Sequence, residues 1–326
     1  MLDKRALITG INGQDGSYLA ELLLEKGYRV LGMMRRQSSP QLHNLKLVKD
    51  HPKFALVSGD LTDPASVRAI IGNFAPHEIY NLGAMSFVKT SWEQPMLTQD
   101  VNFMGFLTVL EAVRGTAVPF VSRIYQASTS EMFGNVPPPQ KETDAMIPHS
   151  PYGVSKLASH QMAKVYRESH GLFVSCGILF NHESPRRGTE FVTRKIARGA
   201  VRIKHGKQKK LVLGNLDSKR DWGHALDYVR AMWMILQHDE PDDFVIGTGE
   251  SHSVGEFVSA AFKIVDIAFW GNYVEIDERL KRPVDIKELR ADASKAFQVL
   301  GWKPNISFDG LVSSMVEAEI NRLKAE

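Results

Sequence analysis

The sequence predicts an α/β protein with a doubly wound parallel sheet, followed by a smaller C-terminal domain. Short runs rich in strand formers alternate with helical patterns through the first half of the 326 residues, which is typical of βαβ units. A glycine-rich turn follows the first of these runs directly and opens a helix. From residue 181 a loop rich in proline, glycine and charge begins, and the later pattern is less regular. The first half therefore has the pattern of a Rossmann-type sheet.

Composition excludes several classes of protein. With 43% hydrophobic and 24% charged residues, the chain is neither disordered, collagenous nor a coiled coil. The net charge is only +3 and there is no basic tail, so we expect no nucleic-acid partner. The single cysteine, Cys176, cannot form an internal disulfide, and no Cys/His spacing indicates a metal site. No apolar stretch approaches the roughly 18 residues of a membrane span, so we expect a cytoplasmic protein without a cleaved signal or a membrane partner.

The predicted elements follow in order along the first half of the chain. The strands are apolar runs at 5–9, 28–34, 54–58, 78–82, 123–128 and 173–179. Apolar residues recur at helical spacing between them, first at Tyr18, Leu19, Leu22 and Leu23 and then within 65–74, 102–113 and 151–169. We expect a first domain over 1–180, joined by a return segment at about 221–250, and a second domain over 181–326.

The glycine-rich turn lies at residues 10–16. Its position between a strand and a helix is the one in which glycines let backbone amides approach a pyrophosphate at the helix N-terminus. A tight turn without a ligand is the alternative. The predicted cofactor-binding residues of this loop are Gly10, Asn12, Gly13, Gln14, Asp15 and Gly16.

Two later strand ends also carry candidate cofactor residues. Arg35 and Arg36 stand where NAD-binding sheets place an acidic residue, and two guanidiniums suit the 2′-phosphate of NADP. Solvated loop arginines are the alternative. Asp60, followed by Leu61, stands after the third strand. Its carboxylate is expected either to accept the adenine amino group or to cap a helix.

The candidate catalytic residues are Thr129, Glu131, Tyr152 and Lys156. Tyr152 and Lys156 are four residues apart in a helical stretch, so an ammonium can stabilise a tyrosinate that acts as a base. If the chain stays extended after the fifth strand, Thr129 and Glu131 share one face. The Thr129 hydroxyl is expected to orient a substrate alcohol. The Glu131 carboxylate adds a second acid/base, which simple hydride transfer does not require. An exposed loop acid is the alternative for Glu131.

Longer segments carry a family resemblance that runs nearly end to end. They include LITGINGQDGSYLAELLLEKGYRV, QASTSEMFG, SPYGVSK, GILFNHESPRRG and LGNLDSKRDWGHALDYVRAMW. With them the chain resembles the extended short-chain dehydrogenase/reductase family and, within it, the GDP-mannose 4,6-dehydratases. The resemblance implies NADP-dependent conversion of GDP-D-mannose to GDP-4-keto-6-deoxy-D-mannose, by oxidation at C4, loss of water across C5 and C6, and reduction at C6. It implies the same four catalytic residues.

The resemblance also implies how the nucleotide sugar is bound. The predicted substrate-binding residues are Ser86, Ser130, Asn181, Arg187, Lys195, Arg220, Arg282 and Asp285. Planar guanidiniums suit a diphosphate because they grip it bidentately. The chain departs from the family pattern at Met85, where an amide is usual, and at Asp285, where a glutamate is usual. Arg35 and Arg36 match a pair that also contacts a neighbouring subunit, so we expect a homodimer or homotetramer built on the helices within 95–113 and 151–169.

Two other functions fit part of this pattern. A nucleotide-sugar epimerase or 4-keto reductase on the same scaffold has no need for Glu131. A catalytically silent NADP-binding sensor is the second alternative, because a fold can keep its ligand-binding site after catalytic activity has been lost. The complete set of four catalytic residues argues against it.

Overall fold

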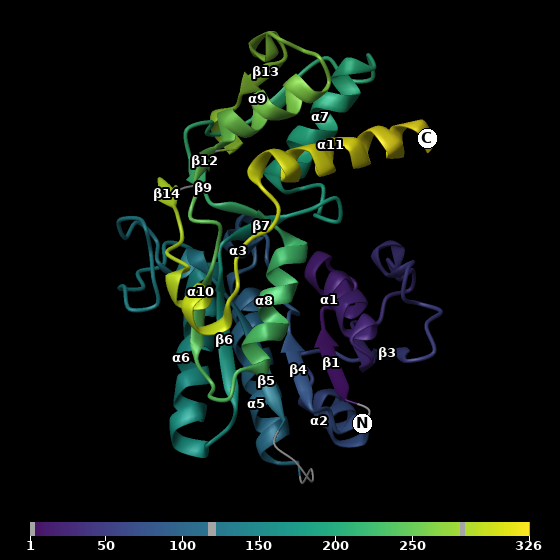
Figure 1. The fold of residues 1–326 in the computed structure, drawn as a ribbon, viewed down its shortest axis with the longest axis vertical. Helices are drawn as coiled ribbons and strands as arrows, with labels where there is room; N and C mark the ends of the chain where they lie inside the picture. The colour runs from purple at the N-terminus through teal and green to yellow at the C-terminus, as the bar shows by residue number, and fades with distance from the viewer. Residues whose placement is uncertain (1–3, 117–121, 281–283, 326) are drawn as a thin grey trace.

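A seven-stranded parallel sheet forms the centre of the molecule (Figure 1). The computed structural model describes residues 4–116, 122–280 and 284–325. The strands are β1 (Arg5–Thr9), β2 (Arg29–Met34), β3 (Phe54–Ser58), β4 (Glu78–Asn81), β5 (Arg123–Thr129), β6 (Val174–Leu179) and β11 (Asp243–Ile246). Their order is β11-β6-β5-β4-β1-β2-β3. The six predicted strands are therefore confirmed, and the chain returns to add β11 beside β6.

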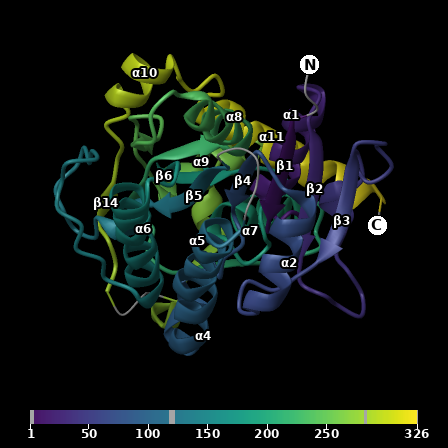
Figure 2. The same ribbon diagram turned by 90° about the horizontal axis from the view of Figure 1, so that it is seen from below.

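Helices cover both faces of this sheet (Figure 2). The helices are α1 (Gln14–Glu25) and α8 (Ala225–Gln237) on one face, with α2 (Pro64–Phe74), α5 (Gly105–Arg114) and α6 (Pro151–His170) on the other. Ala6 and Ile8 of β1 pack toward α1 and α8, whereas Leu7 packs toward α2 and α5. Burial on both faces explains why the strands are almost continuously apolar, and the predicted doubly wound fold is confirmed.

The predicted helix at 102–113 is interrupted. The segment consists of α3 (Val88–Glu93), α4 (Pro95–Gln99), a π-helical turn η2 (Asp100–Met104) and then α5. Asn102 in the π turn is buried and donates to the Ser155 hydroxyl at 3.0 Å, while its side-chain oxygen accepts from the Met85 N–H at 2.8 Å. These bonds join the loop after β4 to α6.

A second cluster of elements lies beyond the carboxyl ends of the strands. Helices α7 (Val192–Lys204), α9 (Val254–Ile264) and α11 (Phe308–Ala325) pack around their own apolar core. Its small strand pairs are β7 (Asn181–Glu183) with β10 (Trp222–His224), and β8 (Leu211–Leu213) with β13 (Val274–Ile276). Strand β9 (Lys219–Arg220) pairs with β12 (His252–Ser253) and β14 (Glu288–Leu289). The remaining elements are α10 (Ser294–Leu300) and the 3-10 turns η1 (His43–Leu45), η3 (Ser130–Met132), η4 (Trp270–Asn272) and η5 (Glu278–Leu280).

Within the described ranges, no helix has both the length and the apolar character needed to cross a membrane.

Candidate functional site

A cleft of about 820 Å³ opens at the carboxyl ends of the strands. It lies where the strand order reverses between β1 and β4, which is the usual ligand site of doubly wound sheets. The C-terminal cluster supplies its opposite wall. The predicted site residues that line it are Gly10, Asn12, Gly13, Gln14, Asp15, Gly16, Ser86, Thr129, Ser130, Glu131, Tyr152, Lys156, Asn181, Arg187, Lys195, Arg220 and Asp285.

The glycine loop forms a close backbone cradle at one end of the cleft. Gly10 has a φ of +67°, and a Cβ there would lie 2.9 Å from the Cα of Gly83. A Cβ at Gly16 would lie 2.5 Å from the Gly10 carbonyl oxygen. Only glycine fits at these two positions. Because the N-cap of α1 is Gly13, no side chain caps the helix, and its first amides suit an anionic ligand.

The Asp15 carboxylate pairs with a histidine that the sequence analysis did not single out. His182 Nε2 lies 2.8 Å from Asp15 Oδ2, and His182 Nδ1 donates to the Phe180 carbonyl at 2.8 Å. Burial alone would raise the pKa of Asp15, but His182 holds it below its ordinary value. Burial alone would lower the pKa of His182, but Asp15 raises it. Since both ring nitrogens face acceptors, the pair is a carboxylate and an imidazolium.

The neighbouring Gln14 side chain also links the start of α1 to the segment that contains His182. Its amide donates to the His182 carbonyl at 3.1 Å and accepts from the Ser184 hydroxyl at 2.8 Å. The side chains of residues 14 and 15 thus tie α1 to the segment after β6. Glycine spacing does not reveal this link. The only signal in the sequence is the long segment GILFNHESPRRG, which contains both partners.

Tyr152 and Lys156 lie one turn apart at the start of α6. The Ser150 hydroxyl caps this helix by accepting from the Gly153 N–H at 3.0 Å. Both side chains are buried, and the Lys156 ammonium donates to the Ala127 carbonyl at 2.8 Å. Burial lowers the pKa of Lys156 to about 8.

The pKa of Tyr152 moves in the direction opposite to the one expected. It is raised to about 12, mainly by burial and also by the charge of Glu131, although a hydrogen bond from Thr129 and the charge of Arg187 oppose this rise. In the described structure it is therefore Thr129 and Arg187 that favour the tyrosinate.

Thr129 and Glu131 come together through a turn. The extended continuation expected after the fifth strand is wrong, because the chain enters the 3-10 turn η3 at Ser130. The Thr129 hydroxyl accepts from the Glu131 N–H at 3.3 Å while it also bonds Tyr152. Glu131 is buried, so it is not an exposed loop acid. The turn places the Thr129 hydroxyl between the Tyr152 phenol and the backbone N–H of Glu131.

Arg187 lies in the loop between β7 and α7. Its Nε is 3.1 Å from the carboxylate of Glu183, and its guanidinium stacks over the ring of Phe191 at 3.6 Å. The charge of Arg187 affects the pKa values of both Tyr152 and Asp15. This arginine therefore acts on both ends of the cleft. Glu183 is a further site residue that the sequence analysis missed.

A polar group from three segments forms the far wall of the cleft. Arg220 is buried and donates from Nη1 to the carbonyls of Lys219 and Ile286, both at 2.8 Å. Its Nη2 lies 3.5 Å from the Asp285 carboxylate, which also accepts from the Ser218 hydroxyl at 2.6 Å. This wall brings Arg220 and Asp285 together although they are far apart in the sequence.

The other predicted site residues lie away from this cleft or outside the described residues. Arg35, Arg36 and Asp60 line a separate hollow of about 590 Å³. Leu61 is buried in the core behind the sheet edge. The Asp60 carboxylate accepts from the Thr62 N–H and hydroxyl, and α2 is capped by Asp63 instead, so the expected helix cap at Asp60 is wrong. Arg282 lies outside the described residues.

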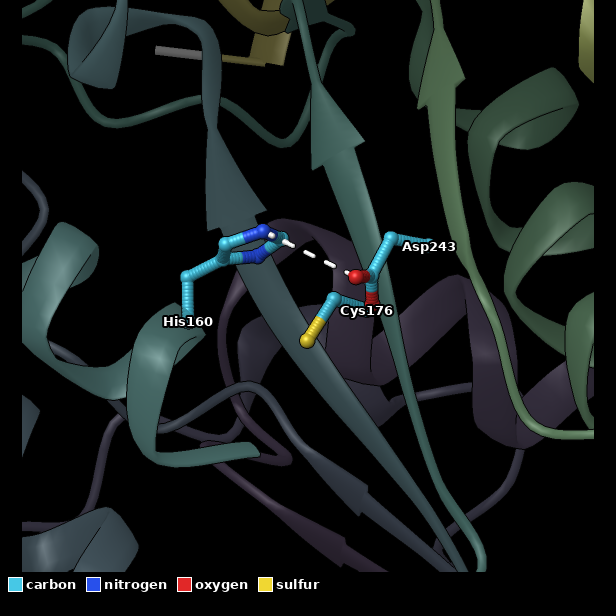
Figure 3. A group of neighbouring side chains, drawn as sticks. All are labelled: His160, Cys176 and Asp243. Atoms are coloured by element: carbon cyan, nitrogen blue, oxygen red, sulfur yellow. Dashed lines mark ion pairs between the residues drawn. The ribbon is translucent and has the colours of Figure 1, made fainter. Parts of the chain in front are cut away.

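One group of potential metal ligands occurs among the described residues, namely His160, Cys176 and Asp243 (Figure 3). Asp243 is 2.6 Å from the Arg167 guanidinium, and His160 Nδ1 is 3.1 Å from the Ser128 hydroxyl. Burial raises the pKa of Cys176 well above its usual range, so the sulfur is a thiol. A neighbouring cation and a protonated sulfur do not suit a metal, and we interpret the group as a polar part of the core.

Comparison with known proteins adds to this geometry. The family model described as GDP-mannose 4,6 dehydratase matches residues 7–315. GDP-mannose 4,6 dehydratase 1 of Arabidopsis thaliana is 49% identical, with 99% of this chain and 91% of the relative covered. The GDP-mannose 4,6 dehydratase of Homo sapiens is 47% identical, with 98% and 92% covered. Among solved structures, the UDP-glucose 4-epimerase of Thermus thermophilus in complex with NAD has a TM-score of 0.83 at 27% identity and covers 97% of this chain and 98% of its own.

Proposed function

The chain belongs to the GDP-mannose 4,6-dehydratase family, and we infer from this membership that it is the hydro-lyase converting GDP-D-mannose to GDP-4-keto-6-deoxy-D-mannose. The observation that carries the mechanism is the buried group formed by Thr129, Glu131 and Tyr152, with Lys156 one turn away. An epimerase or reductase has no use for a buried carboxylate beside the tyrosine, and a silent sensor has no use for the group.

We propose NADP as the cofactor. The cradle at Gly10 and Gly16 leaves room for no side chain, and it suits a pyrophosphate against the N-terminus of α1. Arg35 and Arg36 share their hollow with Asp60, so two cations lie beside the region expected for the adenosine ribose. A nicotinamide held there would supply the acceptor for the hydride that leaves C4 and the donor for the hydride that reaches C6.

Tyr152 takes the proton of the C4 hydroxyl, and Thr129 orients that hydroxyl. Because burial raises the pKa of Tyr152, the tyrosinate needs nearby stabilisation. Thr129 and Arg187 supply part of it in the described structure. Lys156 has a pKa of about 8 and remains mostly cationic at neutral pH. Its ammonium is held by the Ala127 carbonyl and contributes further positive charge to the site.

Glu131 carries the step that makes the reaction a dehydration. Its carboxylate removes the C5 proton, which the C4 ketone has made acidic, and delivers that proton to the departing C6 hydroxyl as water. Oxidation releases one proton at Tyr152, and reduction consumes one at C5. The net change is therefore the loss of one water.

The nucleotide sugar spans the cleft from this group toward the C-terminal cluster. We propose that Arg187 and Arg220 bind its diphosphate, since guanidiniums bind such groups bidentately. The remaining residues proposed to contact the nucleotide sugar are Ser86, Ser130, Asn181, Lys195, Arg282 and Asp285. The helices α7, α9 and α11 then form the nucleotide-sugar-binding part of the protein.

The assembly is proposed as a homodimer in the cytoplasm. Apolar side chains are exposed on one side of the molecule from α3 to α6, and they are Trp92, Met96, Leu97, Met104, Val154 and Val165. A second copy packing its own α4 and α6 against them would cover this surface. A tetramer would use the loop after Arg36 as well.

Mass spectrometry after incubation with NADP and separate nucleotide sugars tests the activity. GDP-mannose should lose the mass of one water, whereas dTDP-glucose and UDP-glucose should stay unchanged. A product of unchanged mass from GDP-mannose would indicate epimerisation and contradict the proposal. Comparable dehydration of dTDP-glucose would contradict the assigned base specificity.

A further inference from the structure

A carboxylate on the C-terminal helix is connected to the loop that carries Arg187. Glu319 of α11 is 6% exposed. Its Oε1 accepts from Arg194 Nε at 3.0 Å and also from Arg322 Nη1. One buried oxygen thus aligns two guanidiniums, one from α7 and one from α11. Arg194 and Glu319 are both largely buried, and removing one partner of a buried ion pair strongly destabilises the fold.

Both guanidiniums also donate hydrogen bonds to the backbone of the loop that carries Arg187. Arg194 Nη1 donates to the carbonyl of Arg187, and Arg322 Nη2 donates to the carbonyl of Pro185. The two acceptors are two residues apart, on either side of Arg186. Glu319 therefore fixes, through two cations, the backbone from which the Arg187 side chain projects.

The opposite side of the loop is held by α1. Arg186 donates to Glu21 at 2.7 Å and to the Ser17 hydroxyl at 3.0 Å, and it stacks over Tyr18 at 3.9 Å. The loop is thus fixed between the first helix and the last one. With α1 fixing residue 186, Arg194 of α7 holds the backbone at residue 187 and Arg322 of α11 holds it at residue 185.

The Arg187 side chain, at the end of this series of contacts, lines the cleft. Its guanidinium stacks over Phe191 beside Glu183, and its charge acts on Tyr152. In a positioned site, a misplacement of about 1 Å can cost on the order of 100-fold in rate. A small shift of the loop backbone therefore matters for what Arg187 binds.

We propose that Glu319 is a positioning residue for nucleotide-sugar binding, acting on Arg187 through Arg194 and Arg322. The inference rests on the proposed role of Arg187. Glu319 does not line the cleft and touches no reacting atom. Its effect should therefore reach the cleft only through Arg187, mainly on binding of the nucleotide sugar and to a smaller extent on the tyrosinate that Arg187 favours.

The first test compares steady-state kinetics of Glu319 variants. Glu319→Ala should raise KM for GDP-mannose about ten-fold, because the contact of Arg187 with the diphosphate is weakened in ground and transition states alike. It should lower kcat by a smaller factor, because Arg187 also favours the tyrosinate. Glu319→Gln should recover most of the loss, because both bonds are made to one oxygen that an amide can supply. Glu317→Ala, at an exposed position of the same helix, should behave as the parent. An unchanged KM in Glu319→Ala, or a loss confined to kcat, overturns the proposal.

A double-mutant cycle separates this proposal from the proposed function. If Glu319 acts through Arg187, adding Glu319→Ala to Arg187→Ala should raise the calorimetric Kd for GDP-mannose no further. Additive effects of the two changes would overturn the positioning role. A parental Kd in Arg187→Ala alone would instead overturn the role of Arg187 in the proposed function. If Glu319→Ala does not fold, Arg322→Ala at a half-exposed side chain takes its place, with the same expected rise in KM and the same overturning result.

Discussion

In the proposed mechanism, Glu131 distinguishes dehydration from simpler redox chemistry. Oxidation at C4 would use Tyr152, Thr129 and Lys156, whereas elimination would use a second acid/base. A turn of the backbone buries Glu131 beside the same hydroxyl that bonds Tyr152. The two steps therefore depend on different side chains and can be separated by substitution.

Glu131→Gln should permit the first hydride transfer but stall elimination. The overall rate should fall by about 10²–10⁴, as is usual when a positioned acid/base is removed. Reduced cofactor should accumulate and be visible by its ultraviolet absorbance in stopped-flow. Tyr152→Phe is the matched control, because it blocks the first step and should give no such absorbance. Dehydration at the parental rate in Glu131→Gln would show that another group removes the C5 proton.

The Asp15–His182 pair should give stability with a defined pH dependence. The pKa of His182 is raised from 6.5, so its contribution is complete below that value and is lost as pH rises through the raised pKa. The pKa of Asp15 is lowered from 3.8, so its contribution is lost only as pH falls through the lowered pKa. The pair therefore stabilises the fold most between pH 3.8 and pH 6.5. His182→Asn should lower the free energy of unfolding by roughly 3 kcal/mol there, measured by urea denaturation. A difference from the parent that grows above pH 7 would contradict the assigned charges.

Local elements decide where each cofactor contact can be made. The turn at 10–16 and the capped start of α6 are built from neighbours in sequence, so their geometry follows from short motifs. The loop after β2 differs, because Arg35 and Arg36 share a hollow with residues that follow β3. Its use depends on the pairing of β2 with β3.

Replacing both Arg35 and Arg36 by serine should remove the preference for NADP over NAD. Each charge-assisted bond to a phosphate contributes about 1.5–3 kcal/mol, so NADP affinity should fall at least ten-fold while NAD affinity changes little. Titration calorimetry with both cofactors measures this. Equal affinities of the parent protein for NADP and NAD would show that the two arginines do not read the 2′-phosphate.

The molecule as a whole joins a sheet that binds a dinucleotide to a helical cluster across one cleft. Asp221 illustrates how the two are connected. Its buried carboxylate accepts from the N–H groups of Thr248, Gly249 and Ala291, so the segments that follow β9, β11 and β14 meet at one side chain. On the outer surface of the molecule, apolar side chains of α4 and α6 are exposed.

Light scattering at micromolar concentration should give a dimer or a tetramer. Val154 and Val165 on α6 are 47% and 48% exposed, and Val154→Arg with Val165→Arg should weaken a dimer that buries them, because unpaired charges would enter an apolar interface. Ser313→Arg on α11, far from this surface along the chain, serves as a control. A parent protein that is monomeric at this concentration would contradict the assembly.

The sequence by itself determined the elements and motifs whose partners are close along the chain. Strands β1 to β6, the glycine turn and the four-residue spacing of Tyr152 and Lys156 all follow from local pattern, because helical and strand periodicity act over a few residues. The long family segments also identified the reaction. The interrupted helix before α5 was missed, since its π turn depends on Asn102 meeting Ser155 across the fold.

Only the tertiary structure decided which charges meet. Asp15 with His182, Arg220 with Asp285, and Glu319 with Arg194 join residues that are far apart along the chain. The raised pKa of Tyr152 belongs to the same class, because burial by the surrounding elements sets it. Electrostatic interactions depend on distance in space and on exclusion of water, and neither is encoded in the spacing of residues along the chain. The folded chain therefore decides which side chains can move a proton and which hold the loop that is proposed to bind the nucleotide sugar.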